Sequence, residues 1–263
     1  MDLGLKGKSV LVTGGNRGIG LGIALAFAEE GANVAICGRD KAALAEAEAK
    51  ISAKGVKVKA ASVDLFTAAG CQAAVDTPVQ AFGGLDILVN NASTAVSGNL
   101  ETLDDNGLME RLQGKTLAYM RCCRAALPHL RKASGGRVIC IGGTASRVAS
   151  DTALPSALGN SSISAFIKQF SNMVAAQGIT VNCVHPPFTK TDRYPARRAA
   201  LAKQLGVSEE EADKRYAAQF PIGRIVEPAD IAPMVLFLAS RHAAAITGQN
   251  IAVDGGSTPG IFY

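Results

Sequence analysis

The sequence lacks the features that would place it in several common functional classes. It has no uninterrupted apolar window of about 18 residues and no charged-then-apolar leader at its start, so we expect neither a membrane span nor a signal peptide. Its 27 basic and 22 acidic residues form no basic block, which argues against nucleic acid as a partner. We therefore expect a soluble, cytoplasmic protein that acts on a small molecule.

The six cysteines also lack the C-x-x-C spacing that is typical of zinc and redox centres. They lie in apolar stretches, at positions 37, 71, 122, 123, 140 and 183. This pattern is typical of small hydrophobic residues buried in a reducing compartment. We expect no metal site.

Short β-branched runs alternate along the chain with longer stretches of helical period. The expected strands are 9–13, 33–37, 56–62, 86–89, 137–141, 180–184 and 250–253, and the expected helices are 19–30, 41–54, 67–82, 105–132, 153–177 and 228–240. Strands that are apolar on both faces and separated by helices predict a parallel sheet covered by helices on both sides. We expect a doubly wound α/β fold with seven parallel strands, in a single domain over 1–263.

The segment 190–219 is unusually charged and helical for a connection between a strand and a helix. Ser208 precedes three glutamates, a pattern typical of a helix N-cap followed by an acidic first turn. Because the segment follows the sixth strand, it would overhang the carboxyl edge of the sheet, where ligands of open α/β folds bind. We interpret it as a substrate lid, with a surface elaboration as the alternative.

A glycine-rich loop, TGGNRGIG at 13–20, connects the first expected strand to an apolar helix. In this context glycines let the backbone approach a pyrophosphate, and the helix N-terminus supplies hydrogen-bond donors and positive potential. A tight turn that binds no ligand is the alternative on spacing alone.

The loop resembles the T-G-x-x-x-G-x-G motif of the short-chain dehydrogenase/reductase family, and the resemblance extends over almost the whole chain. Matching blocks are DL at 64–65, NNAS at 90–93, RAALPH at 124–129, GRVI at 136–139, GR at 223–224, EP at 227–228, Gly248 and VDGG at 253–256. The resemblance implies a Rossmann fold that binds a nicotinamide dinucleotide. The residues expected to contact it are Gly14, Asn16, Arg17, Gly18, Ile19, Gly20, Arg39, Asp64, Leu65, Asn91, Ala92 and Thr191.

The charge near the second strand bears on which cofactor is bound. Members of the family that bind NAD carry an acid there, whereas this chain has Arg39, with Arg17 as a second cation in the glycine loop. Two guanidinium groups could bind a 2′-phosphate, which favours NADP(H) over NAD(H). The alternative is that both arginines are merely solvated.

The resemblance fails at the family's four catalytic positions, which carry Asn, Ser, Tyr and Lys. Alignment places Lys115 at the Asn, Gly143 at the Ser, Ser156 at the Tyr and Asn160 at the Lys. A shift of register cannot restore the tyrosine, because the chain has none between 119 and 194. A serine hydroxyl is a far weaker acid than a tyrosine, so we expect the usual proton transfer to be slow or absent.

The family carries Asn and Lys at two positions that lie near each other, and this chain carries Lys115 and Asn160 there, so the two residue types are exchanged. Lys115 could hold a carboxylate, polarise a carbonyl group or fill space. Ser156, Asn160 and Thr144 are the other candidate catalytic residues, although helix caps and loop hydrogen bonds explain such hydroxyl groups equally well. His185 could act as an acid or base, or pack locally.

Three functions remain open. The first is an atypical NADP-dependent oxidoreductase in which substrate or water supplies the proton. The second is a non-redox lyase or isomerase on the same scaffold, and the third is a nucleotide-binding pseudoenzyme. The resemblance also implies a homotetramer built through the apolar tail 253–263 and the last helix, with a dimer as the alternative.

Overall fold

A computed structural model describes residues 1–259 and shows one parallel sheet with strand order β3-β2-β1-β4-β5-β6-β7. The strands are β1 Ser9–Thr13, β2 Asn33–Gly38, β3 Val58–Ser62, β4 Ile87–Asn90, β5 Arg137–Ile141, β6 Thr180–His185 and β7 Asn250–Ala252. The main helices are α1 Gly18–Glu29, α2 Lys41–Ser52, α3 Ala68–Phe82, α4 Asp105–Arg111, α5 Ala118–Leu130, α6 Leu154–Val174, α7 Tyr194–Leu205, α8 Glu209–Ala217 and α9 Pro228–Ala239. The predicted doubly wound fold with seven parallel strands is confirmed.

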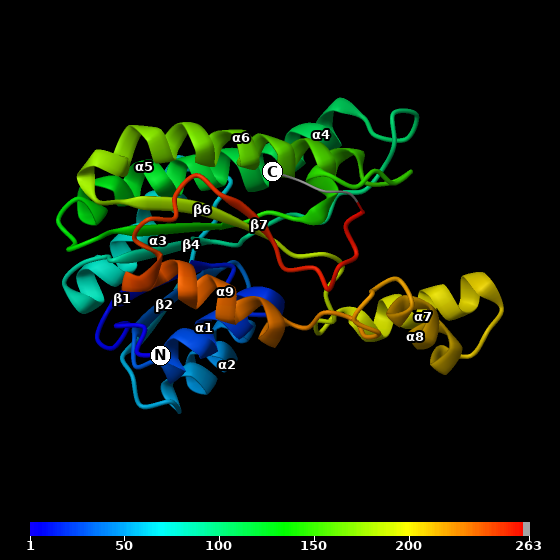
Figure 1. Cartoon of the computed structure of the whole chain (residues 1–263), viewed down its shortest axis with the longest axis horizontal. Coiled ribbons are helices and arrows are strands. Elements are labelled where there is room, and N and C mark those ends of the chain that lie inside the picture. Colours follow the sequence, from blue (N-terminus) through cyan, green and yellow to red (C-terminus); the bar gives the residue numbers. More distant parts are fainter. Residues whose placement is uncertain (260–263) are drawn as a thin grey trace.

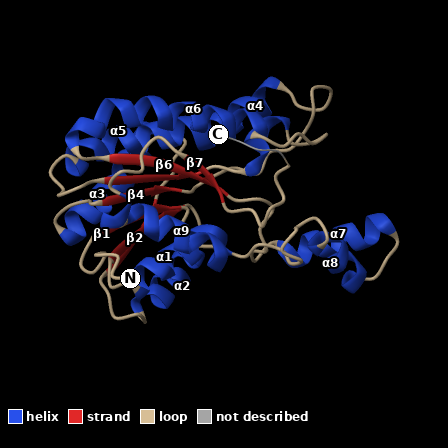
Figure 2. Cartoon of the chain, in the orientation of Figure 1, coloured by secondary structure: helices blue, strands red, loops and turns tan. Residues whose placement is uncertain are grey.

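Two layers of helices cover the sheet (Figures 1 and 2). Helices α1, α2 and α9 pack on one face, and α3, α5 and α6 pack on the other. Strands β1, β2, β4, β5 and β6 are almost wholly buried because both of their faces meet helices, which explains their apolar sequences, whereas the edge strands β3 and β7 are partly exposed. All six cysteines are free and buried within these layers.

The order of the strands reverses between β1 and β4. The chain winds outward from β1 through β2 to β3, then crosses back to place β4 on the other side of β1. The loops that leave β1 and β4 therefore diverge and open a crevice at the carboxyl edge of the sheet, which is where ligands bind in folds of this kind.

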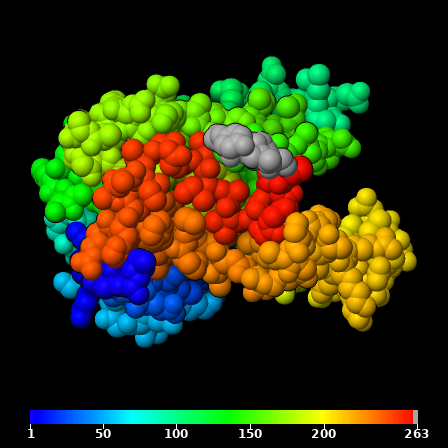
Figure 3. Space-filling model, viewed as in Figure 1, coloured from blue at the N-terminus to red at the C-terminus, as the bar shows by residue number. Residues whose placement is uncertain are grey.

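The lid segment forms α7 and α8, which lie apart from the sheet and its helices in Figure 1 and protrude from the body of the molecule in Figure 3. The predicted cap is present, since the Ser208 hydroxyl accepts a hydrogen bond of 3.1 Å from the Glu211 N–H. The ring of Phe188, after β6, stacks on Tyr216 of α8 with centroids 4.8 Å apart and lies 5.8 Å from the ring of Tyr194 of α7, so it contacts both helices. The phenol of Tyr194 donates to the Asp213 carboxylate and links α7 to α8.

One expected helix, 105–132, is not continuous. A π-helical turn, Leu112–Leu117, separates α4 from α5. Sequence periodicity of 3.6 residues does not distinguish such a turn from an α-helix, and π turns of this kind occur often at functional sites. The expected strands 9–13 and 137–141 match the observed ones, and the other boundaries agree with the expected ones to within three residues. Within the described chain, no helix is long and apolar enough to cross a membrane.

Candidate functional site

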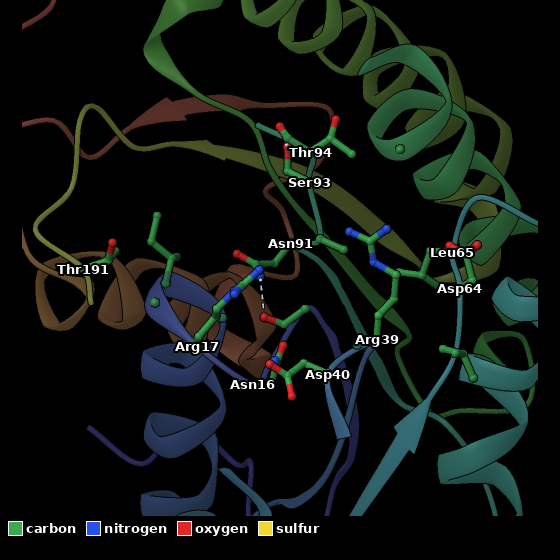
Figure 4. A pocket seen from close by; sticks show the side chains of 18 of the residues that line it. Asn16, Arg17, Arg39, Asp40, Asp64, Leu65, Asn91, Ser93, Thr94 and Thr191 are labelled. Atoms are coloured by element: carbon green, nitrogen blue, oxygen red, sulfur yellow. Dashed lines mark hydrogen bonds between the residues drawn. The ribbon is translucent and has the colours of Figure 1, made fainter. Parts of the chain in front are cut away.

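A cavity of about 560 Å³ lies at the crevice between the loops that follow β1 and β4 (Figure 4). Its walls come from the glycine loop, the ends of β2, β3 and β4, and residues 191–193 at the base of the lid. Cavities of this size hold cofactors and other small ligands in many proteins. The structure brings together at this cavity all of the residues that the sequence assigns to cofactor contact, namely Gly14, Asn16, Arg17, Gly18, Ile19, Gly20, Arg39, Asp64, Leu65, Asn91, Ala92 and Thr191.

The glycine loop needs its glycines for two different reasons. Gly14 has a φ of +65°, which side chains disfavour, and a Cβ there would lie 3.0 Å from the Cα of Ala92. A Cβ on Gly20 would lie 2.3 Å from the Gly14 carbonyl oxygen, so only glycine lets α1 begin this close to the loop. The side chain at the N-cap position, Arg17, does not cap the first N–H groups of α1. These N–H groups therefore remain available as donors to an anion, as a pyrophosphate requires.

Asn91 fixes the loop relative to β4. Its side-chain amide donates to the carbonyl oxygens of Thr13, at 3.0 Å, and Gly14, at 3.2 Å. The Thr13 hydroxyl in turn accepts the Asn91 N–H at 2.9 Å. Asn91 therefore holds the two walls of the crevice together through its own hydrogen bonds.

Two cations flank the outer part of the cavity, Arg17 in the glycine loop and Arg39 after β2 (Figure 4). Neither forms an ion pair with any acid among the described residues. The nearest acid along the chain, Asp40, accepts the N–H groups of residues 42 and 43 at 3.1 Å each as the N-cap of α2. Both guanidinium groups are exposed and free to meet a phosphate.

Phe66 also lines this part of the cavity, a role that sequence reasoning missed; the only signal for it is its position directly after the Asp64-Leu65 pair. The Arg39 guanidinium lies 5.9 Å from the centroid of the Phe66 ring, on its face. Asp64 accepts the Phe66 N–H at 3.1 Å and keeps its second carboxylate oxygen without such a bond. An aromatic face, a cation and a carboxylate suit an adenine ring with a nearby phosphate.

None of the four candidate catalytic residues, Lys115, Ser156, Asn160 and Thr144, lines the cavity, although Gly114, which precedes Lys115 in the π-helical turn, does. The Lys115 ammonium is buried and donates a hydrogen bond of 2.9 Å to the carbonyl oxygen of Gly142. The expectation that Lys115 supplies a free ammonium to the pocket is therefore wrong, because the ammonium is buried and is already bonded to the Gly142 carbonyl group. Ser156 lies half-buried in the first turn of α6, and the Thr144 N–H donates to the Pro186 carbonyl oxygen at 3.0 Å.

Lys115 and Asn160 do meet at one feature, the Gly142–Gly143 turn after β5. Asn160 is buried, and its side-chain nitrogen would lie 2.6 Å from a Cβ on Gly143. Burial lowers the pKa of Lys115 to about 7, and the neighbouring charge of Arg111 adds to this effect.

Arg111, which sequence reasoning missed, is buried at the end of α4 and donates through Nη1 to the Ser93 hydroxyl at 2.7 Å and to the Thr94 carbonyl oxygen. Ser93 and Thr94 line the cavity. A signal for Arg111 was available, since it stands four residues before Lys115 and eight before the buried Tyr119, at helical spacing.

His185 has a local role. Its buried ring places Nε2 at 2.8 Å from the Asn250 side-chain oxygen and accepts the Gly143 N–H on Nδ1 at 3.2 Å. Burial lowers the pKa of His185, although the Asn250 hydrogen bond opposes this shift. The ring therefore joins β6 to β7 and to the turn after β5. Farther along, the Thr189 hydroxyl donates to the Pro187 carbonyl oxygen at 3.0 Å and lies away from the cavity wall, which Thr191 forms.

The chain is similar to known proteins over nearly its full length. Residues 14–258 match the family described as enoyl-(acyl carrier protein) reductase. The 3-oxoacyl-(acyl-carrier-protein) reductase FabG of Chlamydia pneumoniae is 31% identical over 258 residues, which cover 98% of this chain and all of that protein.

Two solved structures share the fold closely. L-Sorbose reductase of Gluconobacter frateurii, in complex with NADPH and L-sorbose, has a TM-score of 0.94 at 30% identity, and the match covers 99% of this chain and 100% of that one. A double mutant of a Serratia marcescens short-chain dehydrogenase/reductase has a TM-score of 0.87 at 32% identity, covering 97% and 99%. With its crevice, its glycine loop and these relatives, the chain belongs to the short-chain dehydrogenase/reductase family.

Proposed function

We propose that this protein is an NADP(H)-binding oxidoreductase that acts on a small carbonyl or alcohol substrate without the tyrosine and lysine pair usual in its family. The observation that carries the proposal is the pair of exposed arginines, Arg17 and Arg39, which face the cavity with no acidic partner in the described structure. A 2′-phosphate dianion needs charged donors of this kind. L-Sorbose reductase, which shares the fold, binds NADPH.

The residues present fit such a cofactor along the whole crevice. The backbone of the glycine loop would hold the pyrophosphate, Asp64 and Phe66 the adenine, and Thr191 the carboxamide of the nicotinamide ring. Bound NADPH would supply a hydride to a carbonyl carbon. The lid base at residues 191–193 would close this end against water.

The proton has to come from elsewhere than a tyrosine, and we assign it to water or to the substrate itself. Ser156 is a poor acid because of the high pKa of an aliphatic hydroxyl group. Lys115 holds the Gly142 carbonyl group and so shapes the turn after β5 rather than donating its proton to a ligand. The resulting rates should be low compared with those of relatives that carry all four catalytic residues.

The first experiment is a titration of the purified protein with NADPH and then with NADH, followed by cofactor fluorescence and by calorimetry. We expect NADPH to bind at least about tenfold more tightly, since each charge-assisted contact to the phosphate contributes roughly 1.5–3 kcal/mol. Absence of binding by both cofactors at millimolar concentration would overturn the proposal.

A nucleotide-binding pseudoenzyme is the second candidate. It is favoured by the position of Lys115, Ser156, Asn160 and Thr144 away from the cavity wall. Tight NADPH binding without oxidation by any ketone or aldehyde in a broad panel would support it over the oxidoreductase.

Assembly into a homotetramer, with a dimer as the second possibility, is a further proposal based on the family resemblance. Residues 260–263 of the apolar tail invoked for it lie outside the described residues. Light scattering tests it, because the chain mass is 27.0 kDa and the oligomers would have two or four times that mass.

A further inference from the structure

Within the lid segment 190–219, all of which the structure describes, one cation faces the cavity without an acidic partner. Four other basic residues of the segment form ion pairs, namely Lys190, Arg198, Lys214 and Arg215. The Arg197 guanidinium lies 5.2 Å from the centroid of the Phe188 ring, and Lys203 is outside the cavity lining. The remaining one, Arg193, is exposed in the cavity wall at the start of α7, and no ion pair of the described residues involves it.

The base of the lid lies directly against the start of α1. A Cβ on Gly18, the first residue of α1, would lie 3.4 Å from the Thr191 Cγ2 and 3.6 Å from the Asp192 Oδ1. In Figure 4 the glycine loop lies between Thr191 and Arg39. The N-terminus of α1 is where backbone donors meet a pyrophosphate. Arg193 therefore belongs to this part of the cavity and not to the end that Arg39 occupies.

The charges at the lid base show what an arginine contributes there. Asp192 is exposed and also lines the cavity, and its carboxylate pairs with no described cation. A carboxylate this close to the start of α1 opposes the binding of an anion. The guanidinium group of the next residue, Arg193, offsets that charge and can donate to two phosphate oxygens at once.

A contact made by Arg193 would act on the whole lid, because α7 and α8 are bound to each other. The Tyr194 phenol donates to the Asp213 carboxylate, and Arg198 pairs with Glu209 and Asp213. Tyr194 is buried and follows Arg193 directly in the chain. A ligand that fixes Arg193 would therefore restrain both helices.

We infer that Arg193 binds the pyrophosphate of the dinucleotide from the lid side, so that the bound cofactor holds the lid against the glycine loop. The inference rests on the proposed function, because it adds a binding residue to the same cofactor site. NADPH and NADH both contain the pyrophosphate, so Arg193 should contribute to the binding of both. The contact of Arg39 with the 2′-phosphate should contribute to NADPH alone.

Titration with NADPH and with NADH tests this difference in the wild type, in Arg193→Gln and in Arg197→Gln. Arg193→Gln should weaken the binding of both cofactors by about ten- to a hundredfold, as expected for a lost charge-assisted contact. Arg197→Gln is the matched control, one turn farther along α7 and outside the cavity lining, and should leave both affinities unchanged. Both side chains are exposed, so the variants should fold.

A second probe, adenosine 2′-monophosphate, carries the 2′-phosphate without the pyrophosphate. The wild type and Arg193→Gln should bind it equally. A loss confined to NADPH, or a similar loss for this probe, would contradict the assignment to the pyrophosphate. Equal affinities in Arg193→Gln and Arg197→Gln would overturn the inference and leave the proposed function standing, whereas a wild type that binds neither cofactor would overturn both.

Hydrogen exchange measures the effect on the lid. With both proteins saturated with NADPH, amide exchange in α7 and α8 should slow by about tenfold in the wild type and by clearly less in Arg193→Gln. Equal protection in the two proteins would show that the contact does not hold the lid. Asp192→Asn, which removes the opposing charge, should bind both cofactors more tightly, and weaker binding would contradict this account of the charges.

Discussion

The Lys115 ammonium lies 2.9 Å from the carbonyl oxygen of Gly142 and is almost completely buried. The pair joins the π-helical turn before α5 to the end of β5, and it places a titratable group where water does not reach it. The consequences of this contact can be measured without knowing the substrate.

The first prediction concerns the pH dependence of stability. Burial lowers the pKa of Lys115 to about 7 in the folded state, while the ordinary value is 10.5. Between these values the unfolded chain binds more protons than the folded one, so the free energy of unfolding should rise with pH from about 7 to 10.5. One pKa unit corresponds to about 1.4 kcal/mol, which makes the rise several kcal/mol.

Denaturant unfolding at pH 6 and pH 9 checks this prediction in the wild type and in Lys115→Met. The variant should show a smaller rise with pH, and equal slopes in both proteins would contradict it. The comparison is needed because other groups face Lys115 from the elements around it, namely Arg111, Tyr119, Cys140, Cys183 and His185.

The second prediction concerns cofactor preference. Arg39→Asp should weaken NADPH binding by about a hundredfold or more, because a charged contact to the 2′-phosphate is replaced by repulsion. NADH affinity should stay the same or improve. Fluorescence titration measures both, with Lys41→Asp as a control that changes the charge equally, at the start of α2 and outside the cavity lining. A similar loss in both variants would indicate a general charge effect.

The third prediction concerns the close approach of α1 to the glycine loop. In Gly20→Ala the new Cβ would lie 2.3 Å from the Gly14 carbonyl oxygen, so the helix has to shift. We expect a loss of about 1–3 kcal/mol in stability and loss of NADPH binding. Gly84→Ala is the matched control, since a Cβ there meets nothing within 4 Å. Thermal melts and NADPH titration measure the two effects. A Gly20→Ala protein with the stability and the NADPH affinity of the wild type would contradict the prediction.

The fourth prediction concerns the family's catalytic residues. A variant with Lys115→Asn, Gly143→Ser, Ser156→Tyr and Asn160→Lys should reduce a neutral ketone such as ethyl acetoacetate at least about a hundredfold faster than the wild type, the usual contribution of a placed general acid. The control carries Ser156→Phe in place of Ser156→Tyr, which supplies a ring of similar size without the acid. Equal rates for the two variants would show that the missing phenol does not limit the reaction.

The fifth prediction concerns the lid. Tyr216→Ala removes the ring that stacks on Phe188, and α8 should open more often as a result. Trypsin cleavage after Lys214 or Arg215 should accelerate at least about tenfold, which corresponds to 1.4 kcal/mol. Glu210→Ala, which breaks only an exposed pair with Lys214, should leave the rate nearly unchanged. Rates that match in the two variants would mean that the aromatic cluster does not hold the lid.

The sequence predicts the sheet, its helices and the outer cavity well because these depend on local patterns. The glycine loop, the apolar strands and the position of Arg39 after β2 each carry their structural meaning within a few residues. The surroundings of Arg111 and Asn160 depend on packing between elements that are distant in the sequence, so local patterns do not predict these contacts. Arg111 reaches Ser93 from α4, and Asn160 of α6 packs on Gly143, contacts that periodicity alone cannot specify.

Because all six thiols are buried, the rate at which each one reacts with a reagent in solution reports how often the fold opens around it. They are distributed over β2, α3, α5, β5 and β6, and burial raises the pKa of Cys37 to about 12. An alkylating reagent can therefore reach most of them only during excursions that separate a helix from the sheet. The order in which the thiols become labelled would reveal which layer comes apart first, and how far a bound dinucleotide delays it.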